Sequence, residues 1–170
     1  IVSVIIYLED NGSIFYSQKR IGLNGKPFTI YKLISMKMDA EKDGAQWASR
    51  KDPRITFIGK IIRKARIDEL PQLICVLRGE MSLIGPRPER KEFERKIEKE
   101  IPNYRIRHLI KPGLSGWAQV NYPYGASLKD AENKLSYDLF YIRNISLFLD
   151  LVIFIKTIRL VANRRGAQPD

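Results

Sequence analysis

Two adjacent carboxylates, Asp68 and Glu69, follow a cationic run in this sequence. Arg63, Lys64 and Arg66 lie within the five residues before them, so an anion could be held where both carboxylates sit. Carboxylates that face a phosphate need cations or a metal ion between them, because like charges repel. This combination is what phosphoryl transfer requires, whereas an Asp-Glu pair on its own is more often a solvated helix end.

A second segment suited to phosphate is Gly79–Pro88, an apolar stretch that ends in Pro86-Arg87-Pro88. The two prolines restrict the backbone on both sides of Arg87, so its guanidinium can fork onto phosphate oxygens with little further loss of entropy. Taken alone, this tripeptide is more typical of a structural corner with an exposed arginine.

Helical periodicity indicates which elements position these groups. Apolar residues recur at helical spacing from Phe57 to Lys64, which predicts a helix leading up to the carboxylates. Pro71 disfavours an α conformation at Leu70, so the carboxylate pair is predicted to lie at a break before a second helix, Pro71–Leu77. The unpaired N–H groups of a first helical turn suit anions.

Upstream, two β-rich runs, Ile14–Ile21 and Pro27–Leu33, flank the dipeptide Asn24-Gly25. This pattern predicts an antiparallel hairpin, because a type I′ turn needs a positive φ at both of its central residues. The polar stretch Asp43–Pro53 is predicted to be a mobile loop.

Downstream, the sequence predicts mainly helices. The charge-dense run Glu89–Glu100 fits a solvated helix that rests on a narrow apolar stripe. Lys111–Gly116 is predicted to be a loop and Leu128–Asn144 a helix.

The last apolar segment, Ile145–Ala162, contains Asp150, Lys156 and Arg159, which argues against a transmembrane helix. A helix of this kind suits burial between the protein and a membrane surface. Burial in a purely protein core is the competing interpretation.

The chain has 170 residues and a formal net charge of +11, from 30 Lys and Arg against 19 Asp and Glu. The length suits one domain, residues 1–170, and the charge favours anionic partners such as nucleic acid, anionic lipid or a phosphorylated substrate. Cys75 and His108 each occur once, so an internal disulfide is excluded and a His-rich zinc site is not expected. The chain opens without Met, as a piece of a longer protein would, and Ile1–Leu8 fits the tail of a hydrophobic helix.

Three blocks, Ile67–Gln72, Met81–Pro88 and Gly113–Val120, resemble the signature blocks of the bacterial sugar transferases, which are monotopic polyprenyl-phosphate phosphoglycosyl transferases. The resemblance extends from about Ile14 to Gly166. It implies an α+β fold that is mainly helical with a small N-terminal antiparallel β-hairpin, forming one membrane-associated monotopic catalytic domain. It also implies a place at the cytoplasmic face of the bacterial inner membrane.

The resemblance further implies a two-step reaction in which Asp68 is the nucleophile. A nucleoside-diphosphate sugar, such as a UDP-hexose, gives its sugar-1-phosphate to this carboxylate. Polyprenyl (undecaprenyl) phosphate then takes the phosphosugar, which starts exopolysaccharide synthesis. Glu69 helps to hold Mg²⁺, and the preference of this ion for carboxylate and phosphate oxygens agrees with that role. Assembly into a homo-oligomer is left open.

Further residues correspond to substrate-binding positions of the family, and the simpler interpretations of each stay open. Arg63 could be a surface arginine, Gln119 a buried loop amide and Tyr137 a structural residue. The residues implied to bind substrate are Lys32, Arg63, Arg87, Gln119 and Tyr137.

Two positions depart from the commonest family pattern. Arg66 stands where many members have Ser, and residues 121–127 replace a sequence that contains Asn-Gly-Arg. Both changes resemble an exopolysaccharide branch associated with exosortase systems.

Two other classes of function compete with this interpretation. A nucleic-acid-binding module would account for the net charge, but the sequence has no zinc-ligand spacing, no recognition-helix pattern and no aromatic-glycine RNA motif. No nucleic acid partner is therefore expected. A non-catalytic membrane scaffold of the same fold is the other alternative, and the intact Asp68-Glu69 pair and Arg87 argue against it.

Overall fold

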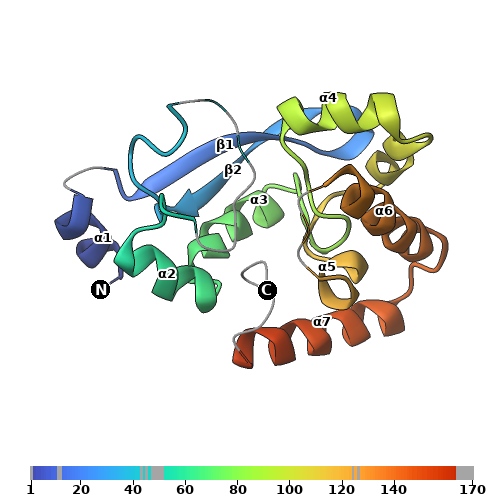
Figure 1. Ribbon diagram of the computed structural model, residues 1–170. Helices are drawn as coiled ribbons and strands as arrows, with labels where there is room; N and C mark the ends of the chain where they lie inside the picture. Colours follow the sequence, from blue (N-terminus) through green and yellow to red (C-terminus); the bar gives the residue numbers. More distant parts are fainter. Residues whose placement is uncertain are drawn as a thin grey trace.

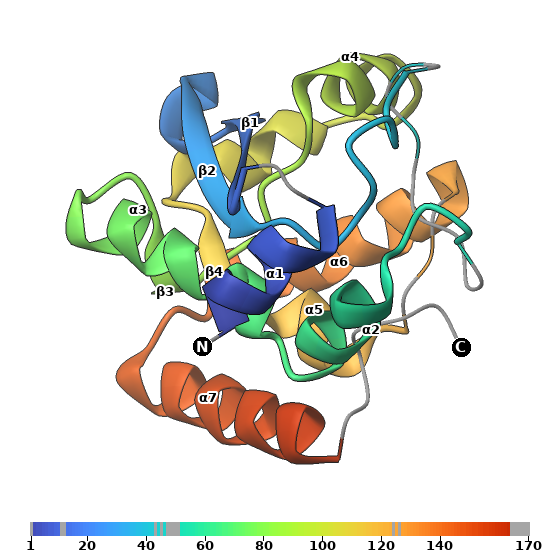
Figure 2. The same ribbon diagram turned by 90° about the vertical axis from the view of Figure 1, so that its left-hand side faces the viewer.

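The computed structural model describes residues 2–10, 13–42, 44, 46, 52–123, 125 and 127–163, and helices predominate in its α+β arrangement (Figure 1). The β1–β2 hairpin and α4 lie along one edge, α7 lies along the opposite edge, and the other helices lie between them (Figures 1 and 2). In chain order, the elements are α1 (Val2–Asp10), β1 (Phe15–Ile21), the 3₁₀ helix η1 (Leu23–Gly25), β2 (Pro27–Leu33), α2 (Phe57–Lys64), the 3₁₀ helix η2 (Ile67–Gln72), α3 (Leu73–Leu77), β3 (Ser82–Ile84), α4 (Lys91–Glu100), the 3₁₀ helix η3 (Tyr104–Leu109), β4 (Gly113–Ser115), α5 (Trp117–Asn121), α6 (Leu128–Arg143) and α7 (Leu147–Ala162).

The predicted hairpin is confirmed. Strands β1 and β2 pair in antiparallel register along their full length. Asn24 and Gly25 both have positive φ, at 55° and 72°, and the N–H of Lys26 donates to the carbonyl of Leu23 (3.1 Å). A type I′ turn therefore closes the hairpin, because these two residue types adopt positive φ at little cost. Most of the predicted loop Asp43–Pro53 lies outside the described residues.

Helix α2 leads to the carboxylate pair and stops just before it. The hydroxyl of Thr56 caps the helix by accepting a hydrogen bond from the N–H of Gly59 (2.9 Å). A Cβ on Gly59 would collide with the carbonyl oxygen of Ser35, so this glycine lets the helix approach the segment after β2. Arg66 is in the left-handed conformation (φ 57°, ψ 18°), which ends the helical run.

The carboxylate pair lies in η2, between α2 and α3, so the predicted break is confirmed. The bounds of the second helix were wrong, because Pro71 belongs to η2 and α3 begins only at Leu73. The tighter 3₁₀ turns continue through Gln72, and this places Gln72 among the buried residues together with the two carboxylates.

A short parallel pair of strands, β3 and β4, was missed by the sequence analysis. Ser82 pairs with Gly113 and Ile84 with Ser115, so the loop prediction for Lys111–Gly116 was wrong at Gly113–Ser115. Three residues are too few for an alternating pattern to stand out. The backbone at Gly113 runs so close to Gly85 that a side chain would collide there.

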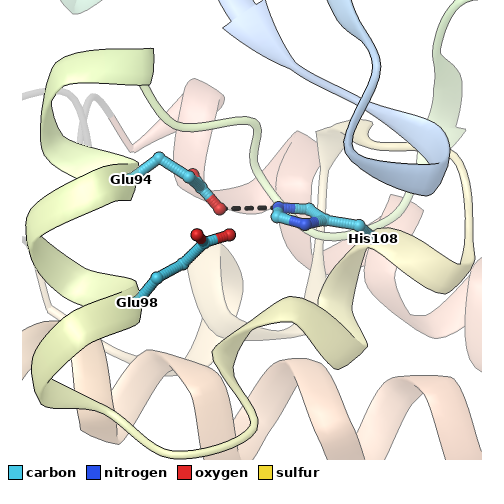
Figure 3. A group of neighbouring side chains, drawn as sticks. All are labelled: Glu94, Glu98 and His108. Carbon is cyan, nitrogen blue, oxygen red and sulfur yellow. Dashed lines mark ion pairs between the residues drawn. The ribbon is translucent and has the colours of Figure 1, made fainter.

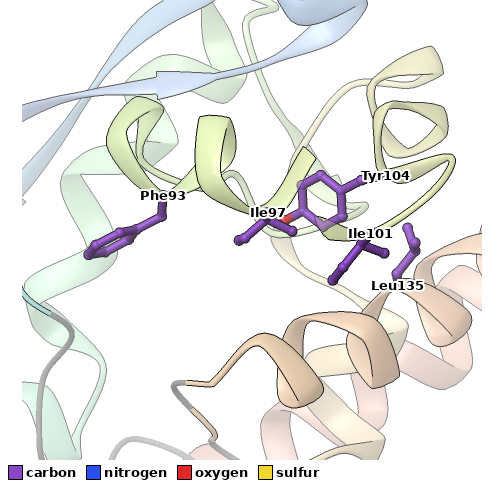
Figure 4. Close-up of a cluster of buried hydrophobic side chains, with 5 residues drawn as sticks. All are labelled: Phe93, Ile97, Ile101, Tyr104 and Leu135. Atoms are coloured by element: carbon purple, nitrogen blue, oxygen red, sulfur yellow. The ribbon is translucent and has the colours of Figure 1, made fainter. Parts of the chain in front are cut away.

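Helix α4 is confirmed as a polar helix on a narrow apolar stripe, although it begins two residues later than predicted. Phe93 and Ile97 form that stripe and pack with Ile101, Tyr104 and Leu135 between α4, η3 and α6 (Figure 4). A separate cluster joins α1 to β2 and α2. The apolar opening of the chain is thus helical, and part of it packs against the rest of the protein.

Helix α7 contacts the protein through one side, on which Lys156 also donates to Asn121 of α5 (2.5 Å). Ile153 is fully buried, the hydroxyl of Tyr141 donates to Asp150 (2.7 Å), and the hydroxyls of Thr157 and Ser115 are 2.6 Å apart. The rest of the helix exposes large apolar side chains, so burial in a purely protein core is wrong for this segment. These exposed side chains are Leu147, Phe148, Leu151, Phe154, Ile155 and Ile158. Among the described residues, no helix combines the length and apolar character that crossing a bilayer would need.

Candidate active site

A cavity of about 810 Å³ lies beside the hairpin and is also lined by residues of η2, α5 and α6. The fold brings six of the seven predicted site residues to it, from segments far apart in the sequence, whereas Tyr137 does not line it. The six are Lys32, Arg63, Asp68, Glu69, Arg87 and Gln119. A cavity of this size matches a typical small-molecule site.

Glu69 is buried under cations. Its Oε1 accepts hydrogen bonds from the Nζ of Lys32 (2.8 Å) and from Arg87, and its Oε2 accepts from the Nη1 of Arg66 (3.3 Å) and again from Arg87 (3.4 Å). Burial alone would raise the pKa of Glu69, but these three cations together hold that pKa well below its usual range. Glu69 is therefore a permanent anion that gathers positive charge at the cavity wall.

Asp68 has the opposite surroundings, although it is only one residue away. It is 7% exposed, and its Oδ1 has no hydrogen-bond partner within the described parts of the chain. Burial and the neighbouring charge of Glu69 raise the pKa of Asp68, while Lys32, Arg63 and Arg66 act to lower it. A carboxylate oxygen with no donor attached keeps its electron pairs available for attack on an electrophile.

Arg87 reaches Glu69 from a corner that other residues hold in place. Its backbone carbonyl accepts a hydrogen bond from the Nη2 of Arg107 (2.7 Å). Arg107 is buried and also donates to the carboxylate of Asp138 (2.8 and 3.1 Å) and to the hydroxyl of Tyr104 (2.6 Å). The contact with Glu69 raises the pKa of Arg87, so the guanidinium stays charged.

Lys32 of β2 and Arg63 of α2 place further positive charge near Asp68. Burial lowers the pKa of Lys32, and the neighbouring Glu69 counteracts part of that shift. Arg63 is half-buried and lies near enough to Asp68 to influence its pKa.

The two remaining predicted residues differ in position. The amide nitrogen of Gln119 donates to the carbonyl of Leu114 (3.1 Å), while its Oε1 is buried with no described partner. The ring of Tyr137 instead packs against that of Tyr122, with centroids 5.9 Å apart, and Tyr122 lines the cavity. The substrate-binding role of both residues stays a prediction.

The sequence analysis missed a second group of charges on the cavity wall. Arg90 forks onto the carboxylate of Glu41 (2.7 and 3.0 Å), which also accepts from the hydroxyl of Tyr16 (3.1 Å). Arg66 was noted in the cationic run and as a departure from the family pattern but was not assigned to the site, yet it contacts Glu69 directly. The cationic run before Asp68 was the signal that could have identified Arg66.

The site therefore combines a carboxylate with an unengaged oxygen, a second carboxylate that is paired with three cations, and further cations in one large cavity. Residues 1–164 match the bacterial sugar transferase family, so the chain belongs to that family and the resemblance of the three blocks is confirmed.

Individual relatives are similar over nearly the whole chain. It is 48% identical over 166 residues to a UDP-N-acetylgalactosamine-undecaprenyl-phosphate N-acetylgalactosaminephosphotransferase of Aeromonas hydrophila, and the match covers 98% of this chain and 39% of that protein. It is 39% identical over 169 residues to a UDP-glucose:undecaprenyl-phosphate glucose-1-phosphate transferase of Xanthomonas campestris pv. campestris, covering 98% and 35%. It is also 40% identical over 168 residues to an uncharacterized sugar transferase, EpsL, of Bacillus subtilis, covering 96% and 77%. The chain thus spans well under half the length of the first two relatives.

Proposed function

We propose that this chain is the catalytic part of a phosphoglycosyl transferase that moves a sugar-1-phosphate from a UDP-sugar to undecaprenyl phosphate. The observation that carries the proposal is the buried Asp68 with an unengaged oxygen, beside Glu69 and three cations. Two of the relatives are named for transfers of this kind. Initiation of exopolysaccharide synthesis is part of the same proposal.

The chemistry we propose has two displacements at one phosphorus atom. A carboxylate oxygen of Asp68 attacks the phosphorus that bears the sugar, and the bond from this phosphorus to the UMP oxygen breaks, so UMP leaves with the electron pair. An oxygen of undecaprenyl phosphate then attacks the same phosphorus, and the bond to Asp68 breaks. The carboxylate is regenerated, and the product is a lipid diphosphate sugar.

Lys32, Arg66 and Arg87 have donors that could move from Glu69 to the phosphate oxygens of an incoming substrate. A diphosphate carries negative charge that would otherwise repel the attacking carboxylate, so these cations lower the barrier by neutralising it. Arg90 and Tyr16 lie on another part of the cavity wall and offer further donors.

Glu69 fits Mg²⁺ in its donor chemistry, because its carboxylate supplies two hard oxygens, whereas the unengaged Oδ1 of Asp68 is left for attack on phosphorus. Mg²⁺ bound there would neutralise the charge of the diphosphate. Both oxygens of Glu69 accept hydrogen bonds from cations, so we propose that Glu69 becomes a ligand only where Lys32 or Arg87 has moved to a phosphate.

The decisive experiment uses the full-length protein with a panel of UDP-sugars and Mg²⁺ but no lipid acceptor. We expect UMP in amounts stoichiometric with enzyme, and a protein heavier by one sugar phosphate on the peptide that contains Asp68. Asp68→Asn should give neither signal, because an amide is a poor nucleophile. The matched variant Glu69→Gln should form the adduct slowly, with partial recovery at high Mg²⁺.

If rapid quenching finds no adduct, and UMP is released only when both substrates are present, direct attack by undecaprenyl phosphate becomes the better mechanism. Asp68 would then be a general base or a metal ligand. The two alternatives, a nucleic-acid-binding module and a non-catalytic scaffold, are not favoured, because the cations converge on carboxylates inside a cavity.

We further propose that the protein works at the cytoplasmic face of the bacterial inner membrane, where its lipid substrate is anchored. Exposed apolar side chains on three helices support this: Phe57 of α2, Leu77 of α3, and Leu147 and Phe148 of α7 are between 73% and 88% exposed. Helices α2 and α7 lie toward the same edge of the molecule (Figure 2). Apolar side chains beside cationic ones are typical of surfaces that dip into the headgroup region.

A further inference from the structure

A second cluster of chemically capable side chains lies outside the cavity, at the junction of α4 and η3 (Figure 3). Glu94 and Glu98 are one turn apart on α4 and point toward His108 of η3. Each of the three offers one potential ligand atom, and these atoms lie within 4.8 Å of one another. None of the three residues lines the active-site cavity.

The centre of this cluster is buried and poorly compensated. Glu94 is 3% exposed and His108 is 8% exposed. Oε2 of Glu94 and Nδ1 of His108 have no hydrogen-bond partner within the described chain. The Nε2 of His108 lies 2.6 Å from Oε1 of Glu94, a contact inside the cluster. A carboxylate taken out of water in this way is costly unless a cation neutralises it.

In the described part of the chain, no Lys or Arg side chain forms an ion pair with Glu94, although Arg107 is near enough to act on it through space. Arg107 is close by, but its donors contact Asp138, Tyr104 and the carbonyl of Arg87. Arg105 lies 3.5 Å from Glu98 on the outer side, and 76% of its side chain is exposed.

The ring of Tyr104 packs edge-on against the imidazole of His108, with centroids 6.4 Å apart. This contact restrains the orientation of the imidazole toward the two carboxylates.

We propose that Glu94, Glu98 and His108 bind a divalent transition-metal ion, for which Zn²⁺ is the best chemical match. Zn²⁺ binds both imidazole nitrogen and carboxylate oxygen, with ligand distances of about 2.0–2.2 Å. The potential ligand atoms lie within 4.8 Å of one another, so small side-chain rotations would bring all three within ligand distance of one ion. Glu98 keeps 31% of its side chain exposed, so a fourth position on the ion faces water.

The metal would join α4 to η3, the segment that also carries Arg107. It would therefore stabilise the segment that holds the Arg87 corner, without contact with the substrate. The role is structural, and it can be tested without any measurement of transfer activity.

The test uses the tag-free full-length protein in detergent, stripped of metal by a chelator. Zn²⁺ binding is measured by calorimetry, and Co²⁺ is added as a coloured substitute whose visible spectrum reports its ligands. The variants are Glu98→Gln and His108→Gln, and the matched control is Glu100→Gln, an exposed glutamate of the same helix outside the cluster. Each protein is also heated with and without Zn²⁺.

We expect the wild type and Glu100→Gln to bind one Zn²⁺ and to melt at a higher temperature with it. Loss of a residue that hydrogen-bonds to a metal ligand typically weakens metal binding by roughly 10–100-fold. Loss of a ligand itself should weaken Zn²⁺ binding by at least as much. Glu98 is partly exposed, so its variant should fold even if the histidine variant does not. Metal held at Asp68 and Glu69 would survive Glu98→Gln, which separates the two sites.

The proposal fails if the wild type binds no Zn²⁺ at micromolar concentration, or if Glu98→Gln binds and melts like Glu100→Gln. Glu94 and His108 would then be a buried ion pair that holds α4 and η3 together by itself. Either result leaves the proposed transfer reaction untouched.

Discussion

Three cations converge on Glu69 and leave its neighbour Asp68 with an oxygen that no described donor reaches. This uneven distribution gives the two carboxylates different chemistry. Glu69 is held as an anion and gathers the cations, while Asp68 keeps an unengaged oxygen, which suits the nucleophile role that we propose for it. Because the cations hold Glu69 ionised and act on the pKa of Asp68, substitutions of these cations should affect both carboxylates.

Arg87→Lys should be poorly active although the charge is kept. Lysine is a point charge and cannot reproduce the fork that Arg87 makes with both oxygens of Glu69. We expect UMP release to slow by roughly 10²-fold, as for the loss of one preorganised donor. Kinetics equal to those of the wild type would show that Arg87 is only a corner residue.

The pH profile of adduct formation should depend on Arg63. Asp68 must be ionised to attack, and its pKa is raised, so the rate should rise with pH through a value above the ordinary 3.9 or so. Arg63 lowers this pKa, so Arg63→Gln should move the acid limb to higher pH. Lys64→Gln, the exposed neighbour on the same helix, is the control. An acid limb that stays in place in Arg63→Gln would contradict the assigned role.

Among elements, η3 connects the core to the active site through Arg107, which is paired with Asp138 of α6. Asp138→Asn would leave the buried charge of Arg107 without its partner, and we expect a loss of about 3–5 kcal/mol in the free energy of unfolding. Glu132→Gln on the same helix breaks only an exposed pair with Lys129 and should change little. Thermal unfolding of the two variants in detergent measures the difference in stability. Equal stability would argue that the pair between Arg107 and Asp138 does not stabilise the protein.

The elements also show why only part of this structure could be predicted. Asn24-Gly25 and the stripe of α4 are local patterns, so the hairpin and the helix were predicted correctly. Strands β3 and β4 are three residues long and depend on a backbone approach at Gly113, which no periodicity reveals. In the site, Asp68 and Glu69 were predicted from the cationic run before them and from the family resemblance. The contact between Glu41 and Arg90 joins residues 49 positions apart, so no local signal existed for it.

At the scale of the whole molecule, net positive charge and the exposed face of α7 should act together on membranes. We expect residues 1–170 to co-sediment with anionic liposomes and to be released as salt rises, since screening weakens the electrostatic part. Replacing both Leu147 and Phe148 with Ser should weaken binding more than Leu109→Ser, which alters an exposed apolar side chain of η3. The expectation fails if there is no binding at low salt, or if these variants bind equally.

Arg66 is a position where stability and catalysis select different residues. Among the described residues, three other than glycine have positive φ: Asn24, Asn103 and Arg66. Asparagine tolerates this conformation far better than a long side chain does, because its short amide can bond locally. Arg66→Asn should therefore raise the melting temperature while slowing UMP release, since Glu69 loses one of its cations. If variants at this position were selected for thermal stability alone, we would expect arginine to be replaced. If variants were selected for stability and activity together, we would expect arginine to be kept.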